Sequence, residues 1–498
     1  PLLSILDQNA KIIREFIGDD NIITEHHSNV ALDEDNADEL KRAQLLTENW
    51  SSPVIITTLV QLLDTLFAGK TSCIRRMHAL CDSVIVIDEV QTVPNEMLSL
   101  FNTAVNFLSE VCGATIVLCS ATQPCLEHTA HPMTENIKDI VPFDEELWRV
   151  FRRTQIIDKG GIRLDAIPAF IAEQLDRTDS LLVICNLKKQ AAYLFTEMNL
   201  GNTVIFHLSA GMCMAHRMAV ISEINSALEK KRTDPDAPKV VCISTQVIEA
   251  GVDVSFGCVI RLCAGLDSVI QAAGRCNRNG ELNGAADVFI INCRGEDLGM
   301  LRSIKDGKMA CMSLLSDYKY HPEKYPSGLT SDEAVYAYYK KLYIQSDIGA
   351  QDMPIKIDGS PFTLFDLLSL DRTYANAPYL KANGEKYALT QAFKTAGSRF
   401  TVFGSRTTDV IVPYGEGKEI IVELGSKRAE EDIKYLKKLI KKARAYTVSL
   451  YENQRRALAD SGALHPIADG IALALSEEFY NEDFGLNLDG ESREAITL

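Results

Sequence analysis

The feature that most constrains the fold of this chain is a repeated alternation of short apolar runs with helical patterns. Runs rich in valine and isoleucine occur at 53–58, 83–89 and 115–122, and polar or turn residues bound each of them. Between the last two runs, apolar residues of 95–111 recur at helical spacing. This alternation is typical of parallel strands joined by crossover helices, so the sequence predicts an α/β fold.

A second series of strand-like runs follows a polar connector, which predicts a second α/β unit in tandem with the first. Its five runs occupy 180–186, 202–209, 239–245, 257–263 and 286–292.

Beyond the second unit the pattern changes to irregular helices and then to a strand or hairpin region before a basic helix. We therefore expect five parts along the chain. A partial first α/β domain (1–135), a connector (136–160), a second α/β domain (161–300), a helical linker (301–384) and a C-terminal accessory domain (385–498) follow one another.

Composition limits the class of protein. The 498 residues are 46% hydrophobic and 24% charged, which is ordinary for several globular domains. No apolar run approaches the roughly 18 residues of a membrane span, so we expect a cytoplasmic protein without membrane partners. The net charge of 51 − 68 = −17 argues against a nucleic-acid coat protein but leaves room for a local basic channel. Thirteen cysteines without a Cys-x-x-Cys pair favour buried thiols over disulfides or a zinc ribbon.

Two carboxylates, Asp88 and Glu89, end the apolar run at 83–89. In an open parallel sheet ligands bind beyond the carboxyl ends of strands, so this pair can serve a metal-bound phosphate. One carboxylate can hold Mg²⁺ through water, and the other can orient or deprotonate an attacking water. Ser120 and Thr122 follow the next strand at the same edge, although a helix N-cap is the simpler interpretation of each hydroxyl alone.

The second unit contributes two arginines at helical spacing, Arg275 and Arg278. Side chains three residues apart share one face of a helical turn, so both guanidinium groups could reach a γ-phosphate across a cleft. Arginines in this role stabilise the charge of the transition state.

In their order along the chain, four motifs resemble motifs II, III, V and VI of a superfamily 2 helicase. They are "DEVQ" (88–91), "SAT" (120–122), "STQVIEAGVDVSF" (244–256) and "QAAGRCNR" (271–278). Two segments upstream of them, at 1–10 and 54–67, resemble motifs Ia and Ib.

More narrowly, four stretches resemble the CRISPR-associated helicase-nuclease of type I interference systems. They are "TTLVQLLDTLF", "IDEVQTVP", "HLSAGMCMAHR" and "QAFKTAGSRFTVFGSRTTDVIVPYGEG". The resemblance implies two tandem RecA-like domains and an ATP- and Mg²⁺-dependent motor on single-stranded DNA. It also implies a guide-RNA surveillance complex as partner and a monomeric chain.

The resemblance also assigns roles residue by residue. Asp88 would serve Mg²⁺ and Glu89 the hydrolytic water, while Gln91, Ser120 and Thr122 would couple the ATP state to domain motion. The nucleotide cleft would be lined by Gly251, Asp253, Gln271, Arg275 and Arg278, and the DNA backbone would be held by Thr57, Thr58, Thr245 and, with a weaker claim, Asn186.

The chain departs from the family's pattern at the phosphate loop. Its Gly69-Lys70-Thr71 follows motif Ib instead of preceding motif Ia, and Asp64 stands where the first glycine of the loop belongs. No histidine is followed by the aspartate of the family's nuclease dipeptide, and the chain opens on Pro1. We therefore expect a fragment that hydrolyses ATP poorly, with the nuclease domain absent.

Two alternative functions stay open. The chain could be a catalytically inactive split or truncated product that only binds DNA or a partner. It could also be a superfamily 2 motor acting on RNA, although the signature of such a motor would read Asp-Glu-Ala-Asp where this chain has Asp-Glu-Val-Gln at 88–91.

The role of one helix is open as well. The basic helix at 427–444 is interpreted first as a docked helix with a solvated basic face, and second as part of a single-strand channel.

Overall fold

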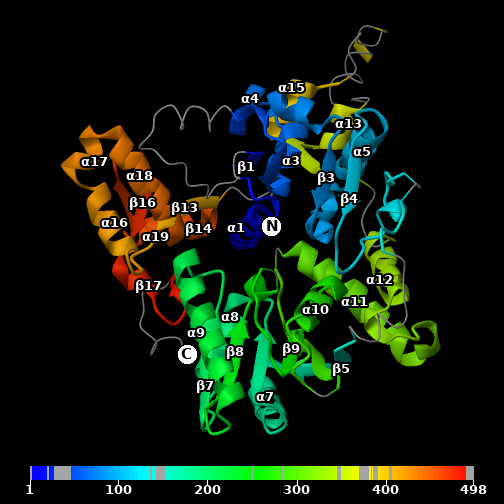
Figure 1. The fold of residues 1–498 in the computed structure, drawn as a ribbon, viewed down its shortest axis with the longest axis vertical. Helices are drawn as coiled ribbons and strands as arrows, with labels where there is room; N and C mark the ends of the chain where they lie inside the picture. Colours follow the sequence, from blue (N-terminus) through cyan, green and yellow to red (C-terminus); the bar gives the residue numbers. More distant parts are fainter. Residues whose placement is uncertain are drawn as a thin grey trace. The chain divides into compact units, whose positions relative to one another are not determined.

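Two units, each made of two separated stretches of chain, form the computed structural model (Figure 1). The first joins Pro1–Pro142 to Met309–Gly404, and the second joins Phe143–Lys308 to Ser405–Leu498. The structure describes residues 3–19, 22–26, 46–134, 137–141, 152–249, 251–282, 284–299, 301–344, 349–369, 381–382, 384, 391–402 and 407–488.

A six-stranded, all-parallel sheet in the order β5-β10-β9-β6-β8-β7 organises the second unit. Its strands are β5 (Thr154–Arg163), β6 (Ser180–Ile184), β7 (Thr203–Leu208), β8 (Lys239–Ser244), β9 (Cys258–Leu262) and β10 (Ala286–Arg294). The helices between them are α7 (Ile167–Leu175), α8 (Lys188–Glu197), α9 (Met214–Thr233) and α10 (Leu266–Ala273).

The central strands of this sheet are buried on both faces, which explains their continuous apolar sequences. One core cluster gathers Leu182, Ile184 and Val259, and a second cluster gathers Leu181, Val183 and Ile260. Because neighbouring residues of one strand belong to different clusters, each strand supplies two cores at once.

The boundaries of the units differ from the expected parts of the chain. Strand β5 begins at Thr154, inside the segment expected to be a connector, and pairs along β10 from Ala286. None of its residues is fully buried because it lies at the edge of the sheet, which weakens its sequence signal.

The C-terminal part of the second unit is a four-stranded sheet in the order β14-β13-β16-β15, flanked by helices (Figure 1). Its strands are β13 (Thr407–Ile411), β14 (Thr447–Tyr451), β15 (Leu464–Ile467) and β16 (Ala472–Leu475). The helices are α16 (Gly417–Leu424), α17 (Lys427–Glu431), α18 (Ile433–Ala443) and α19 (Glu452–Asp460), and a small hairpin of β17 (Tyr480–Asn481) and β18 (Gly485–Leu486) follows.

This hairpin fastens the C-terminal part to the loop after β7. Tyr480 accepts a hydrogen bond from the backbone N–H of Cys213 at 3.0 Å, and its hydroxyl lies 3.0 Å from Nδ1 of His216. The backbone N–H of Leu486 donates to the carbonyl of Gly211 at 2.8 Å. A Cβ on Gly485 would come within 2.4 Å of that same carbonyl oxygen, so the approach requires glycine.

Two short parallel pairs carry the first unit: β1 (Ile23–His26) with β2 (Val54–Thr57), and β3 (Val84–Ile87) with β4 (Thr115–Leu118). The first of the two stretches of chain in this unit contributes the helices α1 (Leu3–Ile17), α3 (Leu59–Phe67), α4 (Thr71–Ile74) and α5 (Leu98–Glu110). The later stretch adds α12 (Asp332–Ile344), the hairpin β11 (Pro354–Ile357) and β12 (Ser360–Thr363), α13 (Leu364–Leu368) and α15 (Phe393–Arg399). Helix α11 (Arg302–Tyr320) crosses the boundary between the units.

Much of the stretch expected to be a helical linker packs into the first unit. Ser99 of α5 donates to Asp352 at 2.6 Å, and the side chain of Gln351 accepts from the backbone of Ala130 at 2.8 Å. In the part of the chain that the structure describes, no helix is both long and apolar enough to cross a membrane.

We expect Gly485→Ala to destabilise the second unit more than Gly470→Ala does. Both glycines have positive φ, but nothing lies within 4 Å of a Cβ at Gly470, so that variant isolates the backbone penalty of about 1 kcal/mol. Gly485→Ala adds the clash with Gly211, for a further ~1–3 kcal/mol. Urea unfolding of both variants measures the difference, and equal losses would show that the contact is loose.

Candidate functional site

The acidic pair lies where β3 ends in the first unit. Glu89 has a left-handed backbone (φ 54°), which turns the chain sharply after the strand, and its N–H bonds to Oδ1 of Asp88 at 3.0 Å. Asp88 is exposed and Glu89 is half-buried. A non-glycine residue in this conformation is strained, and such strain is common at functional sites.

A chain of polar contacts links this pair to the end of β4. The amide nitrogen of Gln91 donates to the carboxylate of Glu89, and Ser120 Oγ lies 2.5 Å from the amide oxygen of Gln91. Ser120 also accepts from the backbone N–H of Thr122 at 2.9 Å.

The same chain of contacts continues to α12. The hydroxyl of Thr122, a buried residue, lies 3.3 Å from the hydroxyl of Tyr339. The sequence-predicted residues of motifs II and III are therefore brought together, with Tyr339 as a further member. Nothing in the local sequence around Tyr339 marks it, because it lies 217 positions from Thr122.

The Gly69-Lys70-Thr71 segment joins two helices, α3 and the single turn α4, instead of a strand and a helix. Gly69 packs closely against Gly397. The N–H of Gly69 donates to the carbonyl of Gly397 at 3.2 Å, and a Cβ on Gly397 would lie 2.6 Å from the backbone of Gly69. A phosphate loop needs a strand feeding a glycine-rich turn at a helix N-terminus, so this segment has a structural explanation.

In the second unit the two arginines have different surroundings. Arg275 is 8% exposed, and its guanidinium donates to the carbonyls of Ile248 and Glu249 at 3.1 and 2.6 Å. Arg278 is exposed and pairs with Asp253 at 2.8 Å. Arg275 therefore holds the loop after β8 in place, while Arg278 presents its charge to solvent beside a carboxylate.

The remaining nucleotide-cleft candidates are Gly251, in the loop after β8, and Gln271, in α10. Gly251 has φ 74°, a conformation that favours glycine, and Gln271 lies half-buried in the last turn of α10. Arg278, Asp253 and Gly251 thus belong to one loop cluster of the second unit.

Asn186 lies in a buried polar network and not on a free surface. Its amide donates to the carbonyl of Cys263 and to Glu296, each at 3.0 Å, and its oxygen accepts from Arg261 at 2.7 Å. Glu296 also accepts from Lys308 at 2.6 Å. As every polar atom of the Asn186 side chain has a partner, the structure gives this residue an internal role.

Arg261, at the centre of that network, was not singled out from the sequence. It is fully buried in β9, pairs with Glu249 at 2.8 Å and donates to Ser268 at 2.8 Å. Burial raises the pKa of Glu249, and Arg261 and the Ser268 hydroxyl oppose that rise. An arginine inside an otherwise apolar strand was the sequence signal for such a pair, because buried charges need partners.

A cationic site lies near the carboxyl ends of β6 and β8. The hydroxyl of Thr245 is buried without a hydrogen-bond partner among the described residues, and so is Nε of Arg217. Partial loss of solvation lowers the pKa of Lys188, and the nearby positive charge of Arg217 lowers it further. Burial also lowers the pKa of Arg217. Two neighbouring cations held this way fit an anion such as a phosphate.

The sequence pointed to Thr245 but not to Lys188 or Arg217. Lys188 is the first residue of α8, which follows β6, and Arg217 lies in the first turn of α9, which follows β7, so the topology places both cations at one sheet edge. That placement was the available signal.

Thr57 and Thr58 both bond to nearby backbone. Thr57 donates to the carbonyl of His26 at 2.7 Å across the β1–β2 pair, and Thr58 is the N-cap of α3, accepting from Gln61 N–H at 3.3 Å. The two candidates therefore support the loop after β2 in this structure.

Across the described residues no three His, Cys, Asp or Glu side chains form a metal-binding group. The exposed Asp88 carboxylate is nevertheless suited to a Mg²⁺ ion, which commonly binds one or two carboxylates, waters and substrate phosphates.

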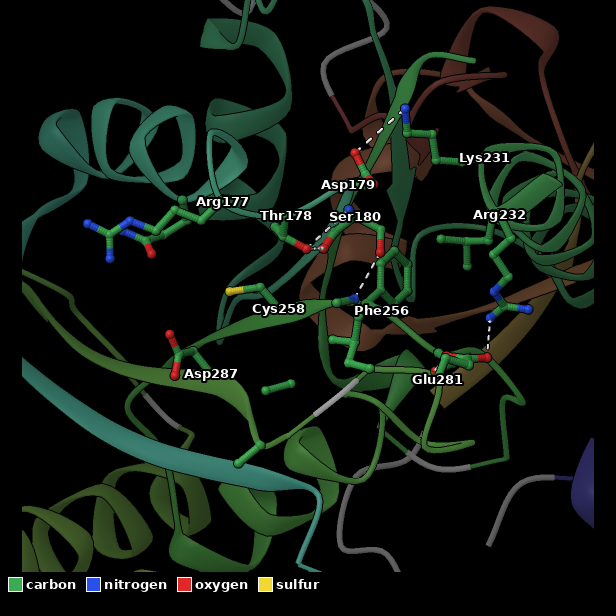
Figure 2. A pocket seen from close by; sticks show the side chains of 17 residues that line it. Arg177, Thr178, Asp179, Ser180, Lys231, Arg232, Phe256, Cys258, Glu281 and Asp287 are labelled. Carbon is green, nitrogen blue, oxygen red and sulfur yellow. Dashed lines mark hydrogen bonds and ion pairs between the residues drawn. The ribbon is translucent and has the colours of Figure 1, made fainter. Parts of the chain in front are cut away.

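A cavity of about 370 Å³ lies at the other ends of the strands, where β6, β9 and β10 begin (Figure 2). Its charges are paired within the protein: Lys231 with Asp179 at 3.6 Å and Arg232 with Glu281 at 2.7 Å. Glu281 also accepts from Ser255 at 2.6 Å, so the wall of the cavity supports the loop that carries Arg278.

The parallel sheet with polar loops at its carboxyl edge makes the second unit an α/β domain. The sequence profile of a family described as "CRISPR-associated nuclease/helicase Cas3, C-terminal" matches residues 177–281. The chain is 26% identical over 383 residues to the CRISPR-associated nuclease/helicase Cas3 of Haloferax volcanii, covering 56% of this chain and 40% of that protein. The corresponding protein of Methanothermobacter thermautotrophicus is 24% identical over 241 residues, covering 46% and 28%.

Solved structures agree on the fold. The crystal structure of T. fusca Cas3 superposes with a TM-score of 0.55 at 15% identity, over 83% of this chain and 52% of that one. The T. fusca Cas3-ATP structure gives 0.54 over the same shares. A chain of a CRISPR RNA-guided surveillance complex, in a pre-nicking state, gives 0.50 at 15% identity over 93% of this chain and 64% of that one.

Residues 177–281 therefore match the C-terminal family of Cas3, and the chain resembles Cas3 proteins in sequence and in fold. The likeness to the Cas3 structures confirms the predicted class, tandem RecA-like α/β domains. The chain spans 40% and 28% of the two curated relatives and about half of the T. fusca Cas3 chain.

We expect Arg261→Met to cost about 3–5 kcal/mol of unfolding free energy at pH 7.5, because it leaves Glu249 buried without its cation. The folded-state pKa of Glu249 is already raised, and losing Arg261 raises it further. A carboxyl with a raised folded pKa favours the folded state as it protonates, so the deficit relative to wild type should shrink at pH 5.5.

Urea unfolding at both pH values measures this deficit. The double variant Arg261→Met, Glu249→Gln is the control, since it removes both charges and should recover part of the loss. A deficit that is the same at both pH values in the single variant would contradict the assignment.

Proposed function

We propose that this chain forms part of an ATP-driven motor that translocates on single-stranded DNA and unwinds target DNA in CRISPR interference. The observation that carries the proposal is the link from Glu89 through Gln91 to Ser120 and Thr122. A motor must pass a change at its hydrolytic carboxylate to other elements, and this chain of contacts leads from that carboxylate to α12.

In this proposal each residue acts from the position described above. When bound, ATP and Mg²⁺ supply the phosphoryl group and the charge that neutralises it. Asp88 would hold the ion, and Glu89 would orient and deprotonate the attacking water. Arg278 would exchange its partner Asp253 for the phosphates, while Arg275 would keep the loop after β8 in its conformation through the carbonyl of Glu249.

The DNA site of the proposal uses Thr245, Lys188 and Arg217. Backbone phosphates would supply the negative charge that these two neighbouring cations need, and the Thr245 hydroxyl, which has no hydrogen-bond partner among the described residues, can donate to a phosphate oxygen. Thr57 and Thr58 would contact the strand from the first unit. The fully bonded Asn186 would position Arg261 and not touch DNA.

We also propose a guide-RNA surveillance complex as the partner. The support is the likeness to a chain of such a complex in a pre-nicking state.

A second candidate function is binding of DNA or a partner without catalysis. It is favoured by one observation: the only Gly-Lys-Thr segment of the sequence joins two helices and packs against Gly397. We accordingly propose that this chain by itself turns over ATP slowly.

We expect the chain as given to show little DNA-stimulated ATP hydrolysis, and a version extended upstream through a glycine-rich phosphate loop to show robust hydrolysis. Glu89→Gln should lower the rate of the active form about 100-fold or more, because it removes the general base. The exposed Glu110 provides a matched control, Glu110→Gln, which should leave the rate unchanged. Fast turnover by the short chain would mean that another segment holds the phosphates.

Binding of labelled single-stranded DNA tests the cationic site without ATP. We expect Arg217→Gln to weaken binding several-fold and to lower the slope of log K against log salt by about 0.7, the value for one phosphate contact. Arg177→Gln is the control, because Arg177 pairs with Glu173 and lies at the opposite ends of the strands. Equal effects of both variants would count against a local site.

A further inference from the structure

Helix α18 presents a continuous face of lysines. Five of its eleven residues are lysine, and helical spacing places all five on the side opposite Leu436, Leu439 and Ala443. The lysines are Lys434, Lys437, Lys438, Lys441 and Lys442.

The apolar side of this helix is already occupied. Leu439 and Ala443 are 3% and 2% exposed and pack against Ile420 and Leu424 of α16 and Ile411 of β13. A helix that enters a membrane surface needs a free apolar face, which α18 does not have. Its lysine face is the side left for a partner.

Four of the five lysines of this face form no ion pair within the described part of the chain. Lys434, Lys437, Lys438 and Lys442 are exposed, and no ion pair to a described carboxylate engages them. Two acids near the helix have other bonds: Asp432 caps the helix, and Glu423 accepts from Tyr435 at 2.8 Å.

Such clustering is unusual in a chain of net charge −17. Lysines four positions apart, such as Lys434 and Lys438, repel each other along the helix. An anionic partner would relieve this repulsion.

The spacing of the lysines fits a phosphate backbone. From Lys434 to Lys442 the helix advances roughly 12 Å, and one strand of B-DNA presents about three to four phosphates over that length. Single-strand sites usually add exposed aromatic rings for base stacking. The one aromatic residue of α18, Tyr435, is covered by Arg428 at 4.1 Å and bonded to Glu423.

We propose that the lysine face of α18 binds the sugar–phosphate backbone of duplex DNA without reading its sequence. This contact is additional to the single-strand site at Lys188 and Arg217, and it rests on the proposed function only in that the ligand is DNA. It needs no ATP. The C-terminal part of the chain would thereby hold the duplex while the strand edge of the six-stranded sheet holds the single strand.

Binding of labelled duplex and single-stranded DNA to the whole chain tests the proposal. The variant carries Lys434→Gln, Lys437→Gln, Lys438→Gln and Lys442→Gln. We expect duplex binding about tenfold weaker and a slope of log K against log salt smaller by about 2 to 3, with single-strand binding unchanged. Glutamine is a good helix former, so the unfolding midpoint should stay the same.

A matched control removes the same charge elsewhere, through Lys11→Gln, Lys230→Gln, Lys356→Gln and Lys394→Gln, four other exposed lysines. It should bind duplex as the wild type does. Replacing the four α18 lysines by arginine should also preserve binding, because the charge remains.

Three outcomes would overturn the proposal. Unchanged duplex binding would do so directly, and an equal loss of duplex and single-strand binding would make α18 part of the single-strand path. Unchanged DNA binding with lost binding to polyglutamate would identify an acidic protein as the partner instead. Arg217→Gln could leave single-strand binding unchanged while the α18 variant weakens duplex binding. That result would refute the cationic site at Lys188 and Arg217 but would still support duplex binding by α18.

Discussion

A fully buried guanidinium, that of Arg261, determines much of the second unit. Taking this charge out of water is costly, and the carboxylate of Glu249, the amide oxygen of Asn186 and the hydroxyl of Ser268 compensate for it, together with the backbone carbonyls of Ile184 and Leu262. The three side-chain partners come from three different loops and helices at the carboxyl edge of the sheet. Their positions are consequently linked, and Glu249 belongs to the same loop that Arg275 holds through its carbonyl.

In this arrangement some polar residues hold the loops in position, and others are free to contact a ligand. Arg261, Asn186 and Arg275 are buried and satisfied, so they fix the geometry of the edge. Arg278 and Lys188 lie at least partly exposed and are the groups able to meet a ligand. Polar residues close together in a motif therefore have distinct physical tasks, which are recognised by burial and by hydrogen-bond partners.

The sequence predicted the parallel sheet because its strands are buried on both faces and read as continuous apolar runs. It also predicted that the residues after β3 and β4 meet, since carboxyl ends of neighbouring parallel strands share an edge. Strand β5 was assigned to a connector because an edge strand lacks that continuous pattern. Tyr339 and Lys188 were not found because their partners are distant in sequence, and helical spacing alone could not show that Arg275 and Arg278 point to different surroundings.

The contact between Gly211 and Gly485 has a consequence for the modular use of this chain. The two backbones touch where any side chain would intrude, so neither position can accept another residue without a change in the opposing segment. Chimeras that exchange the C-terminal part between relatives must therefore carry a matching loop after β7. The loop after β7 and the C-terminal hairpin must therefore be exchanged together, although 273 residues separate Gly211 from Gly485.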